Sequence, residues 1–146
     1  MTINKDYITK KISQGQDYLK IARSVLVLSD EKILSSIKDI TLLERYFQLS
    51  VETILDINNY IIKEANLKLA DDLKSTFKIL ADNNILEQNF AQKFSDIVGL
   101  RNKIVHDYEK IDGNKFVSEF RRHNNDFDEY FKYIILYIEG QLKAER

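Results

Sequence analysis

Three polar residues in one short segment have the types and spacing that acid–base chemistry on a phosphodiester requires. Within Val98–Asp112, which reads VGLRNKIVHDYEKID, Arg101 supplies a permanent cation, Asn102 an amide and His106 an imidazole. Asn102 and His106 are four residues apart, so a helix places them on one shoulder, within reach of the long Arg101 side chain. An imidazole moves a proton near neutral pH, and a guanidinium stabilises the oxygens of a phosphorane. The segment is therefore suited to metal-free phosphodiester cleavage, although His106 as an ordinary surface histidine stays an alternative.

Arg101 lies in the middle of an apolar stripe, where a guanidinium needs a partner. A guanidinium keeps its proton and cannot be buried alone, so this position requires carboxylates, a phosphate or a solvent-filled cleft. Two interpretations stay open: Arg101 faces a phosphate-binding cleft, or it pairs with an acid of another helix, Glu52 or Asp56. On a helical wheel the stripe covers roughly 120° and consists of Phe90, Phe94, Ile97, Val98, Ile104, Val105 and Tyr108.

Few residues that interrupt helices are present, which favours an all-α fold. The 146 residues include no proline and four glycines, and apolar residues recur at helical spacing. We expect a single domain over residues 1–146, built as an up-and-down bundle of about five helices. The expected helices run from about Lys5 to Leu28, from about Asp39 to Ala65 with Asn66 as its stop, over Leu69–Asn84, from about Glu87 to beyond Arg101, and from the break at Asp112–Asn114 through Leu142, with a short turn or helical piece at Asp30–Ser36.

The long helix at 39–65 is apolar on two faces, so it needs two partners. The main stripe contains Leu43, Phe47, Ser50, Ile54, Ile57 and Ile61, and the second face contains Leu42, Tyr46, Leu49, Thr53 and Tyr60. Packing of the second face inside the bundle and a dimer interface both remain open. The dimer hypothesis is a C2 pair that buries this face together with the end of the helix carrying Arg101.

Composition excludes several classes of function. Without cysteine there is no disulfide, no thiolate nucleophile and no Cys-ligated metal. The 22 basic and 23 acidic side chains give a net charge of −1, so any RNA contact is local and DNA is not an expected partner. The longest apolar run, YIILYI, is too short to span a bilayer, and the charged N-terminus lacks a signal-peptide core. We expect a cytoplasmic protein without membrane contact.

No other segment suggests a metal or cofactor site. The acidic pairs Asp71–Asp72 and Asp126/Asp128 lack neighbouring histidines with ligand geometry, and no zinc-protease, P-loop or dinucleotide motif is present. We therefore expect neither metal nor cofactor. His123, which follows Arg121 and Arg122, is interpreted as part of a solvated helix face, with a phosphate-contacting patch as the alternative.

The segment RNKIVHDY resembles the Arg-x4-His-x-Tyr motif of the HepT-like ribonuclease toxins, a branch of the HEPN superfamily. The helix ERYFQLSVETILDINNYII also stands where that family has its long helix. The resemblance implies a HEPN-like dimer whose two motifs line a shared cleft, with Arg101, Asn102 and His106 as catalytic residues. It implies a metal-independent endoribonuclease toxin of a type II or type VII-like toxin–antitoxin system.

The same resemblance implies a protein partner. HepT-like toxins are usually neutralised by a minimal nucleotidyltransferase of the MNT class, which can adenylylate the motif tyrosine, here Tyr108. A core-edge aromatic on the apolar stripe is the alternative role for Tyr108. The alternative function is a non-catalytic HEPN-type module that binds a nucleotidyltransferase or a nucleotide.

Overall fold

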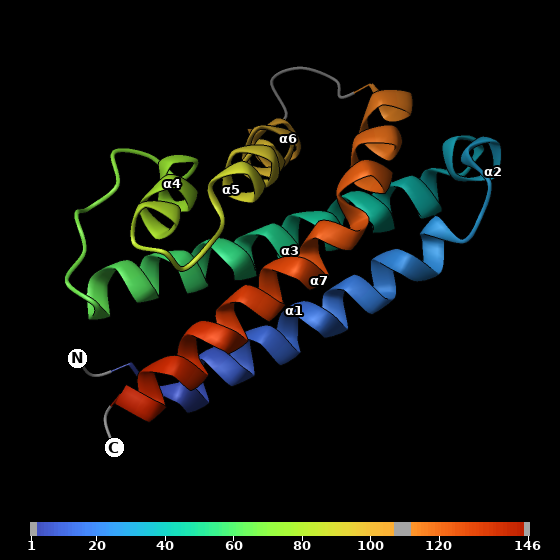
Figure 1. The fold of residues 1–146 in the computed structure, drawn as a ribbon. Coiled ribbons are helices and arrows are strands. Elements are labelled where there is room, and N and C mark those ends of the chain that lie inside the picture. The colour runs from blue at the N-terminus through green and yellow to red at the C-terminus, as the bar shows by residue number, and fades with distance from the viewer. Residues whose placement is uncertain (1–2, 107–111, 145–146) are drawn as a thin grey trace.

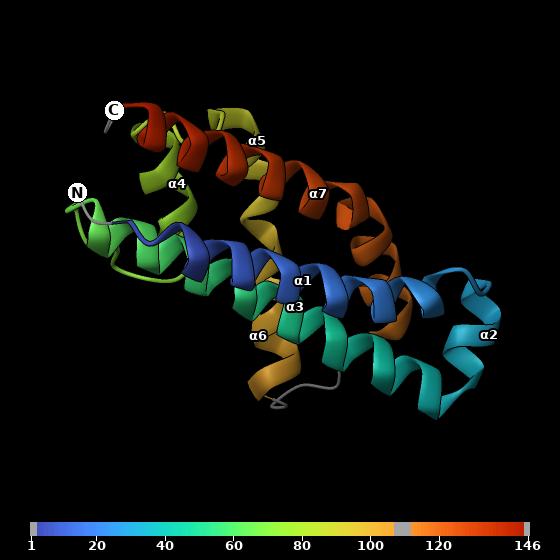
Figure 2. The ribbon, with the colours of Figure 1, turned by 90° about the horizontal axis from the view of Figure 1, so that it is seen from below.

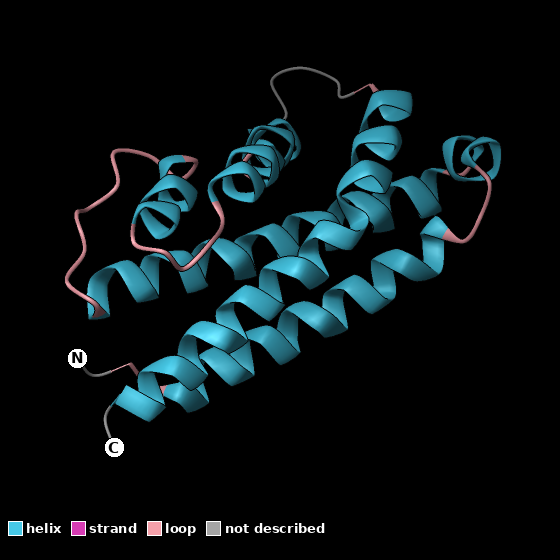
Figure 3. Ribbon diagram, viewed as in Figure 1, coloured by secondary structure: helices cyan, strands magenta, loops and turns pink. Residues whose placement is uncertain are grey.

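Three long helices form the frame of the protein in a computed structural model that describes residues 3–106 and 112–144 (Figures 1 and 2). Both α3 and α7 run antiparallel to α1, and shorter helices complete the fold. Every regular element in the described ranges is a helix (Figure 3), so the expected all-α fold is confirmed. The helices are α1 (Lys5–Leu26), α2 (Asp30–Ser35), α3 (Ile37–Glu64), α4 (Ser75–Asp82), α5 (Gln88–Phe94), α6 (Asp96–His106) and α7 (Gly113–Ala144).

Capping side chains explain where several helices begin. The Asn4 side chain accepts a hydrogen bond from the Tyr7 N–H before α1, and Ser36 accepts one from the Asp39 N–H before α3. These contacts satisfy backbone donors that a first helical turn leaves free. At the other end of α3, Asn66 has a φ of 53°, a left-handed conformation that asparagine tolerates better than most residues. The expected stop at Asn66 is confirmed.

Two expected helices differ from the structure because short-range side-chain bonds compete with the helical ladder. The segment at 69–74 is not α-helical; Asp72 Oδ1 accepts from the Ser75 N–H at 2.7 Å, a bond that fixes a turn and lets α4 begin at Ser75. The single helix expected from Glu87 onward is broken at Ser95, whose hydroxyl donates to the Gln92 carbonyl at 2.9 Å. The structure therefore has seven helices in its described ranges, where about five were expected.

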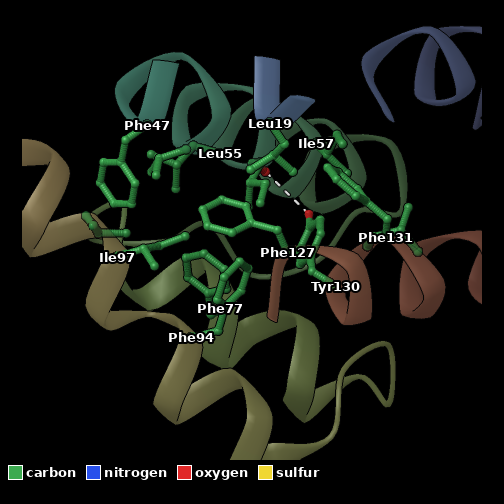
Figure 4. Close-up of a cluster of buried hydrophobic side chains, with 14 of the residues drawn as sticks. Leu19, Phe47, Leu55, Ile57, Phe77, Phe94, Ile97, Phe127, Tyr130 and Phe131 are labelled. Atoms are coloured by element: carbon green, nitrogen blue, oxygen red, sulfur yellow. Dashed lines mark hydrogen bonds between the residues drawn. The ribbon is translucent and has the colours of Figure 1, made fainter. Parts of the chain in front are cut away.

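An aromatic cluster fills the space between α3, α5 and α7 (Figure 4). The Phe94 ring lies 5.1 Å from the Phe127 ring and 5.7 Å from the Phe77 and Tyr130 rings, measured between centroids. The Tyr130 hydroxyl donates to Asn58 Oδ1 at 2.5 Å, which satisfies two buried polar groups at once. These contacts fix α5 and α7 against α3, which carries one wall of the site described below.

Within the chain, α1 packs against part of the second apolar face of α3. Tyr60 packs on Tyr7 with ring centroids 4.3 Å apart, and Tyr46 packs on Tyr18 at 6.0 Å. Leu42, Tyr46, Leu49 and Tyr60 are still only half-buried, so a dimer interface over this face stays a prediction. None of the helices described in residues 3–106 and 112–144 has the length and apolar character needed to cross a membrane.

Candidate functional site

The short helix α6 places the predicted motif beside α3. Ile97 and Val98 are buried and anchor its first turn, whereas Val105 is 39% exposed. The predicted apolar stripe is therefore wrong at Val105. Arg101 lies between the buried turn and the exposed end.

Arg101 forms an ion pair with Glu52 of α3. Its Nη2 donates to Glu52 Oε1 at 3.1 Å, and its Nη1 donates to Asn102 Oδ1 at 3.0 Å. Glu52 Oε1 also accepts from Gln48 Nε2 at 3.1 Å. The side chain of Arg101 is 17% exposed and that of Glu52 33% exposed, so water screens this pair only partly.

Of the two acids proposed as partners of Arg101, the structure pairs Glu52 with it. Asp56 lies one turn further along α3, and its Oδ2 accepts from Lys11 Nζ of α1 at 2.9 Å. The hydrogen bond to Asp56 is the main cause that raises the pKa of Lys11 above its ordinary value. Asp56 thus stabilises the contact between α1 and α3.

One donor of Arg101 has no partner. Among the buried polar side-chain atoms of the described residues, Arg101 Nε alone lacks a hydrogen bond. In a planar guanidinium, Nε and Nη2 form one edge that binds two oxygens of a carboxylate or phosphate side by side. Glu52 takes one position of this edge, and the Nε at the other position is buried without an acceptor among the described residues.

Asn102 and His106 are both residues of α6, four positions apart. Asn102 is half-buried beside Arg101, and the neighbouring Gly99 and Lys103 are exposed. His106 is the last residue of α6, but its side chain lies outside the described residues, as does all of Tyr108. The structure thus brings together Arg101, Asn102 and Glu52 from the predicted set.

The expectation that His123 belongs to a solvated helix face is wrong. Its side chain is 1% exposed, and Nδ1 lies 3.0 Å from Asp126 Oδ2. Burial also removes His123 from direct contact with a phosphate. The sequence did contain a signal, because His123 continues the helical series of buried residues formed by Phe120, Phe127 and Tyr130.

Sequence reasoning missed Gln48, whose amide bonds Glu52. Its position four residues before Glu52 on the same helix was the available signal. In the described ranges, no group of three or more His, Cys, Asp or Glu side chains is arranged to hold a metal ion.

An all-α bundle with an Arg-Asn-x3-His segment at the end of its penultimate helix defines a HEPN-type domain. The family model described as Ribonuclease HepT-like matches residues 16–134, and the chain belongs to this family. The chain is 31% identical over 87 residues to the mRNA nuclease HepT of Shewanella oneidensis, covering 60% of this chain and 65% of that relative. It is 30% identical over 104 residues to the tRNA nuclease HepT of Aphanizomenon flos-aquae, covering 71% and 69% of the two chains.

A solved structure supports the same assignment. The tri-AMPylated HEPN toxin of Shewanella oneidensis, in complex with an MNT antitoxin, superposes with a TM-score of 0.83 at 25% identity. The superposition covers 92% of this chain and 99% of that one. The aligned segment spans just under two thirds of the Shewanella nuclease matched by sequence, whereas the structural match spans nearly the whole solved chain.

Proposed function

We propose that this protein is the endoribonuclease toxin of a type II or type VII-like toxin–antitoxin pair. The observation that carries the proposal is the placement of Arg101, partly exposed and paired with Glu52, beside Asn102 on the helix that ends at His106. A fixed cation suits a phosphate, and an imidazole on the same helix suits proton transfer. The names of the two HepT relatives, an mRNA nuclease and a tRNA nuclease, support RNA as the substrate.

In the proposed reaction, His106 removes the proton of a ribose 2′-hydroxyl, and the oxygen attacks the adjacent phosphorus. The O2′–P bond forms while the P–O5′ bond breaks, and the leaving oxygen takes up a proton. The products are a 2′,3′-cyclic phosphate and a 5′-hydroxyl end, and no step requires a metal ion. Arg101 holds the phosphate oxygens as charge builds up on them, and Asn102 and Glu52 hold the guanidinium in place.

The active unit is proposed to be a C2 dimer with two motifs in one cleft. The proposed interface buries the part of the second face of α3 that α1 leaves exposed, together with the end of α6. Sedimentation at micromolar concentration is expected to give a dimer. A monomer that cleaves RNA at the full rate would contradict the shared cleft.

The proposed inhibitor is an MNT-type nucleotidyltransferase that transfers AMP from ATP to the hydroxyl of Tyr108, in the cytoplasm. Support comes from the AMPylated Shewanella toxin in its complex with an MNT antitoxin. An adenylate two residues from His106 adds negative charge and bulk where RNA must bind. Intact-mass spectrometry after co-expression is expected to show adenylate additions that Tyr108→Phe removes. Complete neutralisation of Tyr108→Phe by the partner would instead favour simple occlusion of the cleft.

The catalytic proposal is tested with purified protein and RNA in excess EDTA. The parent is expected to cleave RNA to cyclic-phosphate ends, and His106→Ala to lose about 10²–10⁴ in rate while keeping its melting temperature. Arg101→Ala is expected to lose activity as well, and also stability, because Glu52 then loses its cation and keeps only the hydrogen bond from Gln48. Undiminished cleavage by His106→Ala would refute the assignment. A parent protein that binds RNA or the transferase without cleaving RNA would support the non-catalytic module.

A further inference from the structure

A groove lies between α4 and α5 and reaches the start of α6. It consists of two adjoining hollows, of about 490 Å³ and 420 Å³, which share Lys74, Gln92 and Ser95. Such volumes are typical of sites for small ligands. We call it the α4–α5 groove, and its lining comprises Asp72, Lys74, Ser75, Lys78, Gln88, Asn89, Ala91, Gln92, Lys93, Ser95 and Asp96.

The three lysines of the groove are held only weakly. Lys74 lies 3.5 Å from Asp96, Lys78 lies 3.1 Å from Asp82, and each of the four side chains is between 48% and 73% exposed. Lys93 contacts the more buried Asp126 at 3.3 Å, with its own side chain 51% exposed. Surface ion pairs contribute little to stability, so a phosphate can replace a carboxylate as the partner of these lysines at little cost.

Each carboxylate would keep another partner if its lysine turned to a phosphate. Asp82 also accepts from Gln88 Nε2 at 3.0 Å, and this bond is the largest cause that lowers the pKa of Asp82. Asp126 lies 3.0 Å from His123 Nδ1, and Asp96 lies 3.7 Å from Arg122. The lysines can therefore exchange partners without leaving an acid unpaired.

Helix α6 connects the groove with the proposed catalytic motif. The groove ends at Ser95 and Asp96, and α6 continues from there to His106, a rise of about 15 Å at 1.5 Å per residue. Midway, a Cβ added to Gly99 would meet no atom within 4 Å. Lys103, one turn further on, is exposed and offers one further cation.

We propose that the α4–α5 groove is a second RNA-binding site that holds the strand beyond the phosphate being cleaved. Lysines contact the phosphates of a single strand, and the amides of Gln88, Asn89 and Gln92 contact base edges. This inference rests on the proposed ribonuclease function and adds to it a site that distinguishes long RNA substrates from short ones. Cleavage of long RNA therefore has a lower KM than cleavage of short RNA, with an unchanged kcat.

The test measures the salt dependence of RNA binding. The variant is Lys74→Gln/Lys78→Gln; Lys93 stays in place because Asp126 is mostly buried. The matched control is Lys10→Gln/Lys20→Gln, which changes two exposed lysines of α1, opposite α4 and α5 in Figure 1. The ligand is a single-stranded 2′-O-methyl RNA oligonucleotide, which binds but lacks the hydroxyl needed for cleavage.

Each phosphate contact contributes about 0.7 to the slope of log affinity against log salt for a single strand. The groove variant loses two such contacts, so its slope is expected to be smaller by about 1.4. Raising the salt from 50 to 200 mM should therefore reduce RNA affinity by a factor about sevenfold smaller in the variant than in the parent. With cleavable RNA, the same variant is expected to raise KM for long substrates and leave kcat unchanged. The control is expected to match the parent in every measurement.

An unchanged slope in the groove variant, or a loss of kcat without a change in KM, would overturn the proposal. So would a parent that does not bind the oligonucleotide. Failure of the ribonuclease proposal looks different: the parent would leave ordinary RNA intact, while the groove variant would still lower the salt slope of binding.

Discussion

Glu52→Ala tests whether the pair with Arg101 positions the proposed catalytic cation. Breaking a fully buried pair costs about 3–5 kcal/mol, and breaking an exposed one about 0–1 kcal/mol. Arg101 is 17% and Glu52 33% exposed, so we expect an intermediate loss of about 2 kcal/mol. At about 2–4 °C per kcal/mol for a chain of this size, the melting temperature should fall by about 4–8 °C.

Asp56→Ala is the matched control, because Asp56 lies one turn further along the same helix and pairs with Lys11. The Asp56 side chain is 52% exposed, so its loss should cost no more than about 1 kcal/mol. It should leave RNA cleavage unchanged. Glu52→Ala should lower kcat by about 10²-fold, the effect expected of a displacement of about 1 Å in a catalytic group.

Glu52→Gln separates geometry from charge. Its amide oxygen still accepts from Arg101, so cleavage should recover most of the parent rate while the melting temperature recovers only in part. The assays are thermal unfolding by circular dichroism and cleavage of a fluorescent RNA at saturating concentration. Equal behaviour of Glu52→Ala and Asp56→Ala would refute the positioning role. Faster cleavage by Glu52→Ala would show that Glu52 competes with phosphate for Arg101.

Two further predictions concern the frame that holds the site. Gly15→Ala would place a Cβ 2.9 Å from Phe131 Cζ, so it should lower the free energy of unfolding, measured in urea, by about 1–3 kcal/mol. Gly140→Ala is the control, because its Cβ would meet nothing within 4 Å. It should stabilise α7 by up to about 1 kcal/mol. Tyr130→Phe leaves Asn58 Oδ1 without its donor and should cost about 1–3 kcal/mol. Burial raises the pKa of Tyr130 well above its ordinary value of 10.0, so the unfolded chain ionises first and stability falls as pH rises above 10.0. The free energy of unfolding, measured at a series of pH values above 10.0, should fall less for Tyr130→Phe than for the parent protein.

The long helices could be predicted closely from the sequence because many apolar residues repeat at one spacing. The observed ends of α1 at Leu26 and α3 at Glu64 lie within two residues of expectation. The break at Ser95 could not be predicted in the same way. The Ser95 hydroxyl bonds the Gln92 carbonyl there, but many serines inside helices make similar bonds without ending the helix.

The need of Arg101 for an acid could be predicted from charge and burial alone, but the choice of acid could not. Glu52 and Asp56 lie one turn apart on the same side of α3, and the crossing position of α6 decides which one Arg101 reaches. His123 shows the opposite error. Its polar side chain favoured an exposed position, whereas its spacing from buried neighbours on the same helix favoured the core. The core position is possible because Asp126 provides a hydrogen-bond partner for the imidazole inside the protein.

Arg101 can stand on an apolar stripe because burial ends at its position. Phe90, Phe94, Ile97 and Val98 are buried. The Arg101 side chain keeps 17% of its surface exposed and bonds Glu52 of α3 at 3.1 Å. Val105, four residues further on, is 39% exposed. The guanidinium thus has an acid within reach and water beside it, and these two conditions let a cation lie at the edge of an apolar core.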